Sequence, residues 1–135
     1  MAATTILFVC FGNTCRSPMA EGLARKMLGE QVYVESAGVA PHNQKAADDA
    51  VSVMANDYGV DISSHRPRRV YDLPLDLFDW IVAIDQEIYD TLYSAYPKNR
   101  SRLIGWQVED PIGRGEGVYR QTAATIEEEI RKLAG

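Results

Sequence analysis

The chain has 135 residues, which is enough for one domain with a substantial core and too few for two. Hydrophobic residues make up 46% of the sequence and charged residues 24%, as in an ordinary globular protein. The net charge of −5 argues against nucleic acid or an anionic membrane as a partner. The N-terminal apolar run ends after about six residues, so we predict neither a signal peptide nor a membrane span.

The few cysteines and histidines limit the chemistry further. Both cysteines, Cys10 and Cys15, fall in one short segment, which is no disulfide framework and fits a reducing, cytoplasmic location. Together with His42 and His65 they do not show the spacing of a zinc site. We therefore expect no metal and no cofactor, and we treat residues 1–135 as a single domain.

Hydrophobic periodicity predicts strands that alternate with helices along the chain. Strands are expected at residues 4–9, 31–35, 80–84 and 103–106, and helices at residues 18–28, 45–58, 86–96 and 118–133. Gly29, Gly59 and Pro97 are expected to end the first three helices. Such alternation favours right-handed crossovers, and so a three-layer α/β domain: a four-stranded parallel sheet with helices on both faces.

The loop between the first strand and the first helix carries the chemistry. From residue 9 to residue 18 it reads Val-Cys-Phe-Gly-Asn-Thr-Cys-Arg-Ser-Pro. A strand-to-helix turn of this kind directs unpaired backbone N–H groups and the positive end of the helix dipole to one point, which favours an anion. The loop lacks the Gly-Lys-Ser/Thr ending of a nucleotide-binding loop, so ATP is a poor candidate ligand.

Cys10 opens this loop and Arg16 closes it. A thiol that several N–H groups and a guanidinium surround should lose its proton easily, because every neighbour stabilises the anion. Arg16 can donate to two phosphoryl oxygens at once, and Ser17 can donate to the thiolate. Asn13 tolerates a left-handed backbone, and its amide can brace the loop. The arrangement suits nucleophilic attack on phosphorus; the alternative is that Cys10 is a buried structural thiol.

This loop resembles the signature of the low-molecular-weight protein tyrosine phosphatases, with the matching residues Val9-Cys10-x-Gly12-Asn13-x-Cys15-Arg16-Ser17-Pro18. Asp110-Pro111 resembles the general-acid loop of that family, and the resemblance spans the whole chain, including Ser36-Ala37-Gly38 and Ser64-His65. It implies a sheet of strand order 2-1-3-4. In parallel sheets ligands bind beyond the carboxyl ends of the strands, and the first strand ends at Cys10.

The resemblance also implies roles for single residues. Cys10 would attack phosphorus, Asp110 would protonate the leaving group, and Arg16 would hold phosphoryl oxygens together with the loop amides. The substrate-binding residues would be Phe11, Gly12, Asn13, Thr14, Cys15, Arg16 and Ser17. The loop would be supported by Asn13, Ser17, Ser36 and His65. Cys15 would be able to form a disulfide with Cys10 that protects the nucleophile from over-oxidation.

Several of these residues have simpler interpretations. Cys15 is equally well explained as a packed thiol. Asp110 is alternatively a carboxylate that stabilises a turn, in which case Glu109 beside it would be a weaker acid. His65 is alternatively a histidine on the surface. The basic residues Arg66, Arg68 and Arg69 are expected to form a solvated face, with substrate steering as the alternative. The glycines at 113, 115 and 117 predict a mobile acid loop and not a dinucleotide site.

One position departs from the family pattern. Ile112 stands where the family usually has an aromatic residue after Asp-Pro, so we expect Phe11 and His42 to wall the cleft. Tyr119 is expected to be a core residue. Because of this departure, the sequence supports the hydrolysis of a phosphate ester more strongly than it supports tyrosine as the leaving group.

We predict hydrolysis of phosphotyrosine in phosphorylated proteins. The main alternative is a protein arginine phosphatase, which shares the residues from Gly12 to Glu21 as they stand here. Arsenate reductase needs further cysteines downstream, which this chain lacks. More distant alternatives are a phosphocysteine carrier, against which Asp110 and Arg16 both count, and a phosphoresidue-binding module, which would not need a thiolate.

Overall fold

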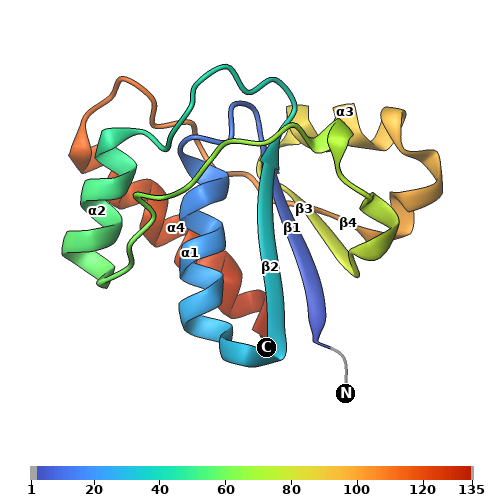
Figure 1. Cartoon of the computed structure of the whole chain (residues 1–135), viewed down its shortest axis with the longest axis horizontal. Helices are drawn as coiled ribbons and strands as arrows, with labels where there is room; N and C mark the ends of the chain where they lie inside the picture. Colours follow the sequence, from blue (N-terminus) through green and yellow to red (C-terminus); the bar gives the residue numbers. More distant parts are fainter. Residues whose placement is uncertain (1–2, 135) are drawn as a thin grey trace.

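The computed structural model describes residues 3–134 and contains one parallel sheet. Its strands are β1 (Thr4–Cys10), β2 (Val32–Gly38), β3 (Trp80–Ala83) and β4 (Leu103–Gly105). The α-helices are α1 (Arg16–Leu28), α2 (Asp48–Tyr58), α3 (Gln86–Ala95) and α4 (Glu116–Ala134). The strand order is β2-β1-β3-β4, and every pair is parallel. The predicted three-layer α/β architecture and its strand order are confirmed (Figure 1).

The two faces of the sheet have separate hydrophobic cores. Side chains alternate along β1, so Ile6 and Phe8 enter one core and Leu7 and Val9 the other. Helices α1, α2 and α4 lie on the first side and α3 on the second (Figure 1). Because β1 is covered on both faces, its sequence is continuously apolar instead of alternating.

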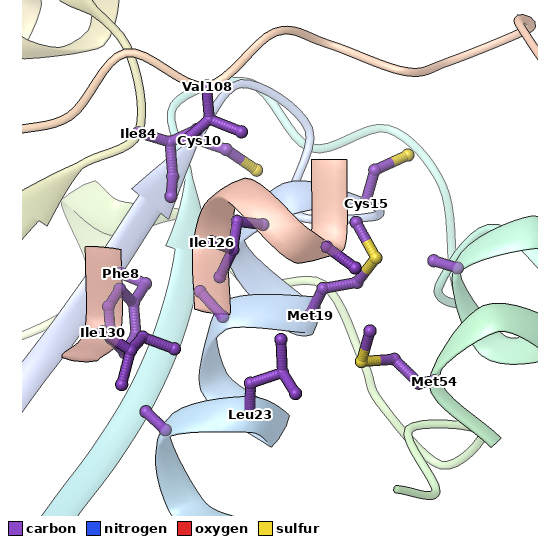
Figure 2. Packing of buried hydrophobic residues seen from close by; sticks show 14 of the residues in the cluster. Phe8, Cys10, Cys15, Met19, Leu23, Met54, Ile84, Val108, Ile126 and Ile130 are labelled. Atoms are coloured by element: carbon purple, nitrogen blue, oxygen red, sulfur yellow. The ribbon is translucent and has the colours of Figure 1, made fainter. Parts of the chain in front are cut away.

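The larger core fixes helix α1 against β1 and α4. Figure 2 shows Met19 and Leu23 of α1 beside Ile126 of α4. All three side chains are at most 1% exposed, and burial of one such side chain stabilises the fold by about 1.5–3 kcal/mol. The start of α1, where the loop ends, is thereby held in place by packing along the whole helix.

Three helices begin at a different residue from the one predicted. Helix α1 begins at Arg16, so Pro18 is its third residue; the first four N–H groups of a helix have no internal partner, and proline loses nothing there. Helix α2 begins at Asp48 and not at residue 45, because Ala47 is extended and donates its N–H to the Thr14 carbonyl at 2.9 Å. Helix α4 starts two residues earlier than predicted, at Glu116, which places Gly117 inside the helix.

The ends of two helices agree with the prediction, whereas strand β2 is longer than predicted. Gly29 and Gly59 end α1 and α2 with positive φ values of 69° and 65°, as predicted for helix stops. Strand β2 runs to Gly38, beyond the predicted end at residue 35, since it pairs with β1 as far as Cys10. The sequence did not predict the short 3₁₀ helices at Gly29–Gln31, Val70–Asp72, Leu75–Leu77 and Pro97–Arg102.

The topology places the loop of residues 11–15 at the point where the strand order reverses. From β1 the chain passes through α1 to β2 on one side, and β3 and β4 then lie on the other side of β1. In open α/β sheets this reversal is where ligands bind. Within residues 3–134 no helix has both the length and the apolar character needed to cross a membrane.

Candidate active site

The loop after β1 forms a cradle around the Cys10 thiol. Asn13 adopts a left-handed backbone with φ of 57°, as predicted, and its N–H donates to Cys10 Sγ at 3.2 Å. Cys15 is the N-cap of α1 but makes no side-chain cap bond, so the N–H groups of the first turn stay available for a ligand. Cys10 itself is 3% exposed.

Asn13 is held by four residues from three separate segments of the chain. Its Nδ2 donates to Ser17 Oγ at 2.8 Å and to Ser36 Oγ at 3.0 Å. Its Oδ1 accepts from the backbone N–H of Arg68 at 2.9 Å, and its carbonyl accepts from His65 Nε2 at 2.9 Å. A carbonyl can only accept, so the His65 proton lies on Nε2. The structure thus places Ser36 and His65 against the loop.

Ser17 brings a hydroxyl group to the sulfur. Its Oγ lies 2.9 Å from Cys10 Sγ and is fully buried. The same oxygen accepts a hydrogen bond from Asn13, so the hydroxyl hydrogen is free to point at the sulfur. The other acceptor within reach, the carbonyl of Ala37, is more distant at 3.4 Å.

Arg16 is buried beside the cavity and is oriented by two acceptors. Its Nη1 donates to Asp85 Oδ2 at 2.7 Å and to the Val108 carbonyl at 2.8 Å. Both bonds use one nitrogen, which leaves Nε and Nη2 as a two-donor edge for an oxyanion. Sequence reasoning missed Asp85, although it lies two residues after the end of β3 at the carboxyl edge of the sheet and N-caps α3.

A small cavity of ≈40 Å³ lies over the loop. That volume has room for a few water-sized atoms and so for one phosphoryl group. Phe11 and Ile112 form its exposed rim, with exposed fractions of 49% and 55%. The lining residues are Cys10, Phe11, Gly12, Thr14, Cys15, Arg16, His42, Asn43, Asp110 and Ile112. His42 thus lies where the sequence analysis expected a cleft wall.

Asp110, and not Glu109, reaches this cavity. Asp110 Oδ1 accepts from the N–H of Ile112 at 3.1 Å, an Asx turn that fixes the carboxylate over the loop. Glu109 instead pairs with Arg114 at 3.4 Å on the exposed side. Gly113 and Gly115 have positive φ values of 73° and 89°, which explains why glycine occupies these positions after the turn.

Cys15 contacts a tyrosine instead of the other thiol. Its Sγ lies 3.2 Å from the hydroxyl of Tyr119, which is buried in the core as predicted. Burial raises the pKa of the Cys15 thiol, and hydrogen bonds from Tyr119 and Thr14 only partly offset that effect. Both cysteines are free, and in Figure 2 the Cys15 side chain points away from Cys10. A disulfide would require Cys15 to turn away from Tyr119.

The basic residues after α2 lie outside the cavity. Arg68 pairs with Glu35 at 2.6 Å and Arg69 with Asp72 at 2.9 Å, so most of their charge is matched at the surface. Among residues 3–134 no cluster of three or more His, Cys, Asp or Glu side chains is placed to hold a metal ion.

Comparisons with known proteins agree with this geometry. A family model described as low molecular weight phosphotyrosine protein phosphatase matches residues 5–135. A probable low molecular weight protein-tyrosine-phosphatase of Ralstonia nicotianae is 42% identical over 136 residues, covering 96% of this chain and 88% of the relative. The crystal structure of a low molecular weight protein tyrosine phosphatase from T. tengcongensis matches with a TM-score of 0.90 and 38% identity, over 98% of both chains.

Similar relatives also carry other names. A protein-arginine-phosphatase of Bacillus subtilis is 32% identical over 142 residues, covering 96% of this chain and 93% of the relative. An arsenate reductase of Staphylococcus saprophyticus is 32% identical over 135 residues, covering 98% of each. Both relatives match this chain over more than nine-tenths of their own length.

Proposed function

Because the chain belongs to the low molecular weight phosphotyrosine protein phosphatase family, whose members are metal-independent hydrolases of phosphomonoesters, we propose that it hydrolyses phosphotyrosine in proteins. One observation carries the proposal. The Cys10 thiol, the Arg16 guanidinium and the Asp110 carboxyl group line one cavity with room for a phosphoryl group, and the Asn13 N–H group donates to the Cys10 sulfur. The site has a nucleophile, an oxyanion cradle and an acid in reach of one another.

In the first step, the Cys10 thiolate attacks phosphorus in line with the leaving oxygen. The sulfur–phosphorus bond forms as the bond from phosphorus to the tyrosyl oxygen breaks. Asp110 gives its proton to that oxygen, so tyrosine leaves as a neutral phenol. The free edge of Arg16 and the N–H groups of the first turn of α1 hold the three equatorial oxygens.

In the second step, water replaces the sulfur. Asp110, now a carboxylate, takes a proton from the attacking water, and the phosphorus–sulfur bond breaks. Cys10 leaves as a thiolate, and the Ser17 hydroxyl at 2.9 Å donates a hydrogen bond to it. Inorganic phosphate then leaves the cavity, and the free enzyme is restored.

The rim of the cavity supports phosphotyrosine as the substrate. Phe11 offers an exposed aromatic face beside the loop, and stacking on such a ring contributes about 0.5–1.5 kcal/mol beyond burial. Ile112 provides an apolar surface on the other wall. A second hollow of ≈410 Å³ adjoins the cavity and shares Thr14, Asn43 and Ile112 with it, which leaves space for the peptide on either side of the phosphorylated residue.

Phosphoarginine is the second candidate substrate. The Bacillus subtilis relative is named for that activity, and Asp110 supplies an acceptor that a guanidinium needs. Phe11 counts against it, because this side chain has no hydrogen-bonding group and narrows the entrance. Arsenate reduction through a thiol relay would need cysteines beyond the loop, and the chain has none. We also propose a cytoplasmic location, because thiols such as Cys10 and Cys15 are kept reduced in the cytosol.

The decisive experiment compares matched phosphotyrosine and phosphoarginine peptides in steady state. We expect the larger kcat/KM for phosphotyrosine, with no requirement for added metal. The Cys10→Ser variant should lose turnover and still bind vanadate or phosphate, because the cradle consists of backbone groups and Arg16. A larger kcat/KM for phosphoarginine would replace the tyrosine assignment, and substantial turnover by Cys10→Ser would exclude the phosphocysteine.

A further inference from the structure

A continuous chain of hydrogen bonds connects the Cys10 sulfur to a glutamate outside the cavity. Cys10 Sγ contacts Ser17 Oγ at 2.9 Å, and Ser17 Oγ accepts from Asn13 Nδ2 at 2.8 Å. The same Nδ2 donates to Ser36 Oγ at 3.0 Å. Ser36 Oγ in turn donates to Glu21 Oε1 at 2.5 Å. Glu21 lies on α1 and does not line the cavity.

The directions of the bonds from Asn13 through Ser36 to Glu21 follow from the groups that take part in them. Asn13 Oδ1 accepts the backbone N–H of Arg68, so Nδ2 must face the two serines and donate to both. Ser36 therefore accepts from Asn13 and has to give its own hydrogen elsewhere. The carboxylate of Glu21 is an acceptor only, and it takes that hydrogen. Ser17 also accepts from Asn13, so its own hydrogen is available to the Cys10 sulfur, which as a thiolate is an acceptor only; the other acceptor in reach, the Ala37 carbonyl, is more distant at 3.4 Å.

Loss of Glu21 would remove the terminal acceptor of the chain. The Ser36 hydroxyl would then be buried with its hydrogen unpaired, which is costly. The unpaired hydroxyl would donate instead towards Asn13, which favours a flipped Asn13 amide whose oxygen faces the serines, at the cost of the bond from the Arg68 N–H group. In that orientation Ser17 would donate to Asn13 and no longer to sulfur.

Glu21 is well placed to keep its role as an acceptor. Its second oxygen, Oε2, accepts from Arg25 Nη2 at 2.8 Å, and the side chain is 18% exposed. Asp61 and His65 line a small hollow of ≈90 Å³ together with Glu21 and Arg25, and Arg68, which is paired with Glu35, donates to the Ser36 carbonyl at 3.3 Å. Burial lowers the pKa of His65, which keeps its ring neutral near pH 7.

We propose that Glu21 is a positioning residue that acts through Ser36 and Asn13. It keeps the Ser17 hydroxyl donating to the Cys10 sulfur, both in the free thiolate and when the sulfur leaves phosphocysteine. This inference rests on the phosphocysteine mechanism proposed above.

The test is the pH dependence of turnover in Glu21→Ala, beside Glu127→Ala as the matched control. Glu127 is also a helix glutamate, 27% exposed and paired with an arginine four residues on at 2.7 Å, but it has no link to the loop. We expect kcat of Glu21→Ala to fall about tenfold, because a hydrogen bond to an ionised group is lost. The acid limb of the pH profile of kcat/KM should move to higher pH. Phosphoenzyme should accumulate in rapid-quench experiments. Glu127→Ala should match the wild type, and Glu21→Gln, which keeps an acceptor, should recover most of the rate.

A double-mutant cycle separates a relay from a general loss of structure. If Glu21 acts through Ser36, Glu21→Ala should have no further effect in a Ser36→Ala background. Additive effects would overturn the inference, and so would a Glu21→Ala enzyme that is less stable but keeps the wild-type acid limb. A wild-type protein that never forms phosphocysteine would refute the proposed function and this inference together. If the wild type forms phosphocysteine and the Glu21 variants keep its kcat and its pH profile, the inference about Glu21 is refuted and the proposed function is not.

Discussion

Asp85 holds the buried Arg16 guanidinium through a 2.7 Å salt bridge and, with its other oxygen, caps helix α3 by accepting from the N–H of Ile88. Arg16 is only 5% exposed, and a buried charge is tolerated only when it is paired. The guanidinium that we propose to hold phosphate is therefore connected to the first turn of a helix on the opposite face of the sheet.

The two roles of Asp85 can be separated by mutation. Asn is as good an N-cap as Asp but carries no charge, so Asp85→Asn should leave the cap intact and release Arg16. We expect kcat/KM of this variant to fall about tenfold, as for the loss of one charged hydrogen bond. Asp85→Ala should lose in addition about 0.5–2 kcal/mol of unfolding free energy with the cap. Urea unfolding and steady-state kinetics measure the two effects, and Asp90→Asn on the same helix is the control. A wild-type value of kcat/KM in Asp85→Asn would show that the salt bridge from Asp85 is not needed to orient Arg16.

The acid role of Asp110 predicts a dependence on the leaving group. Asp110→Asn should slow hydrolysis of a phenyl phosphate with a poor leaving group by about 10²–10⁴-fold, because no proton is available for the phenolate. An activated aryl phosphate that leaves without a proton should be affected much less. Glu109→Gln is the control, since Glu109 faces Arg114 and not the cavity. Equal losses for the two substrates would show that Asp110 has a structural role only.

Phe11 is expected to determine the choice between the two candidate substrates. Phe11→Thr removes the aromatic wall and adds a hydroxyl, so the ratio of kcat/KM for phosphotyrosine over phosphoarginine should decrease. Tyr33, an equally exposed aromatic on β2, provides a control, and Tyr33→Thr should leave the ratio unchanged. An unchanged ratio in Phe11→Thr would show that the preference comes from elsewhere in the cleft.

The contact of Cys15 with Tyr119 predicts how the enzyme responds to peroxide. Peroxide should oxidise the Cys10 thiolate to a sulfenic acid, and the Cys15 thiol should then condense with it, releasing water and forming a disulfide. Cys15→Ser should make inactivation harder to reverse with a thiol reductant. Tyr119→Phe frees Cys15 and should speed disulfide formation. Mass spectrometry that finds no Cys10–Cys15 linkage after oxidation would reject this prediction.

The burial of His65 predicts a pH-dependent stability. Burial lowers its pKa in the folded state, so between that value and the ordinary value of about 6.5 the unfolded chain binds more protons. The unfolding free energy should therefore be highest above about pH 6.5 and fall as the pH drops through the folded pKa. Urea unfolding from pH 7.5 to pH 5 should show this loss, and it should be smaller in His65→Gln. The exposed His42→Gln variant should keep the wild-type slope.

The fold and the loop could be predicted because their signals are local. A continuous apolar run up to Cys10, followed by the loop and an amphipathic helix, determines a buried strand and an anion site without further information. The start of α2 could not be predicted in the same way. Alanine and lysine favour a helix from residue 45, but the bond from Ala47 to the Thr14 carbonyl keeps that segment extended.

The contacts that orient the loop residues could not be predicted from the sequence for a different reason. Asp85, Glu21 and Tyr119 act through side chains that reach across from separate elements. Their types are common on helices, and no spacing in the chain indicates which of them faces the loop. Only Asp85 had a usable signal, because it follows β3 at the same sheet edge as Cys10.

The bracing of Asn13 has a consequence for how the enzyme acquires activity during folding. A left-handed backbone is unfavourable for Asn13 alone, and its partners come from α1, β2 and the segment after α2 that contains His65 and Arg68. Contacts between such distant segments form later than local helices. We therefore expect refolding chains to regain helical structure before they bind phosphate, and a fragment that ends after α2 to lack the two contacts that His65 and Arg68 make with Asn13.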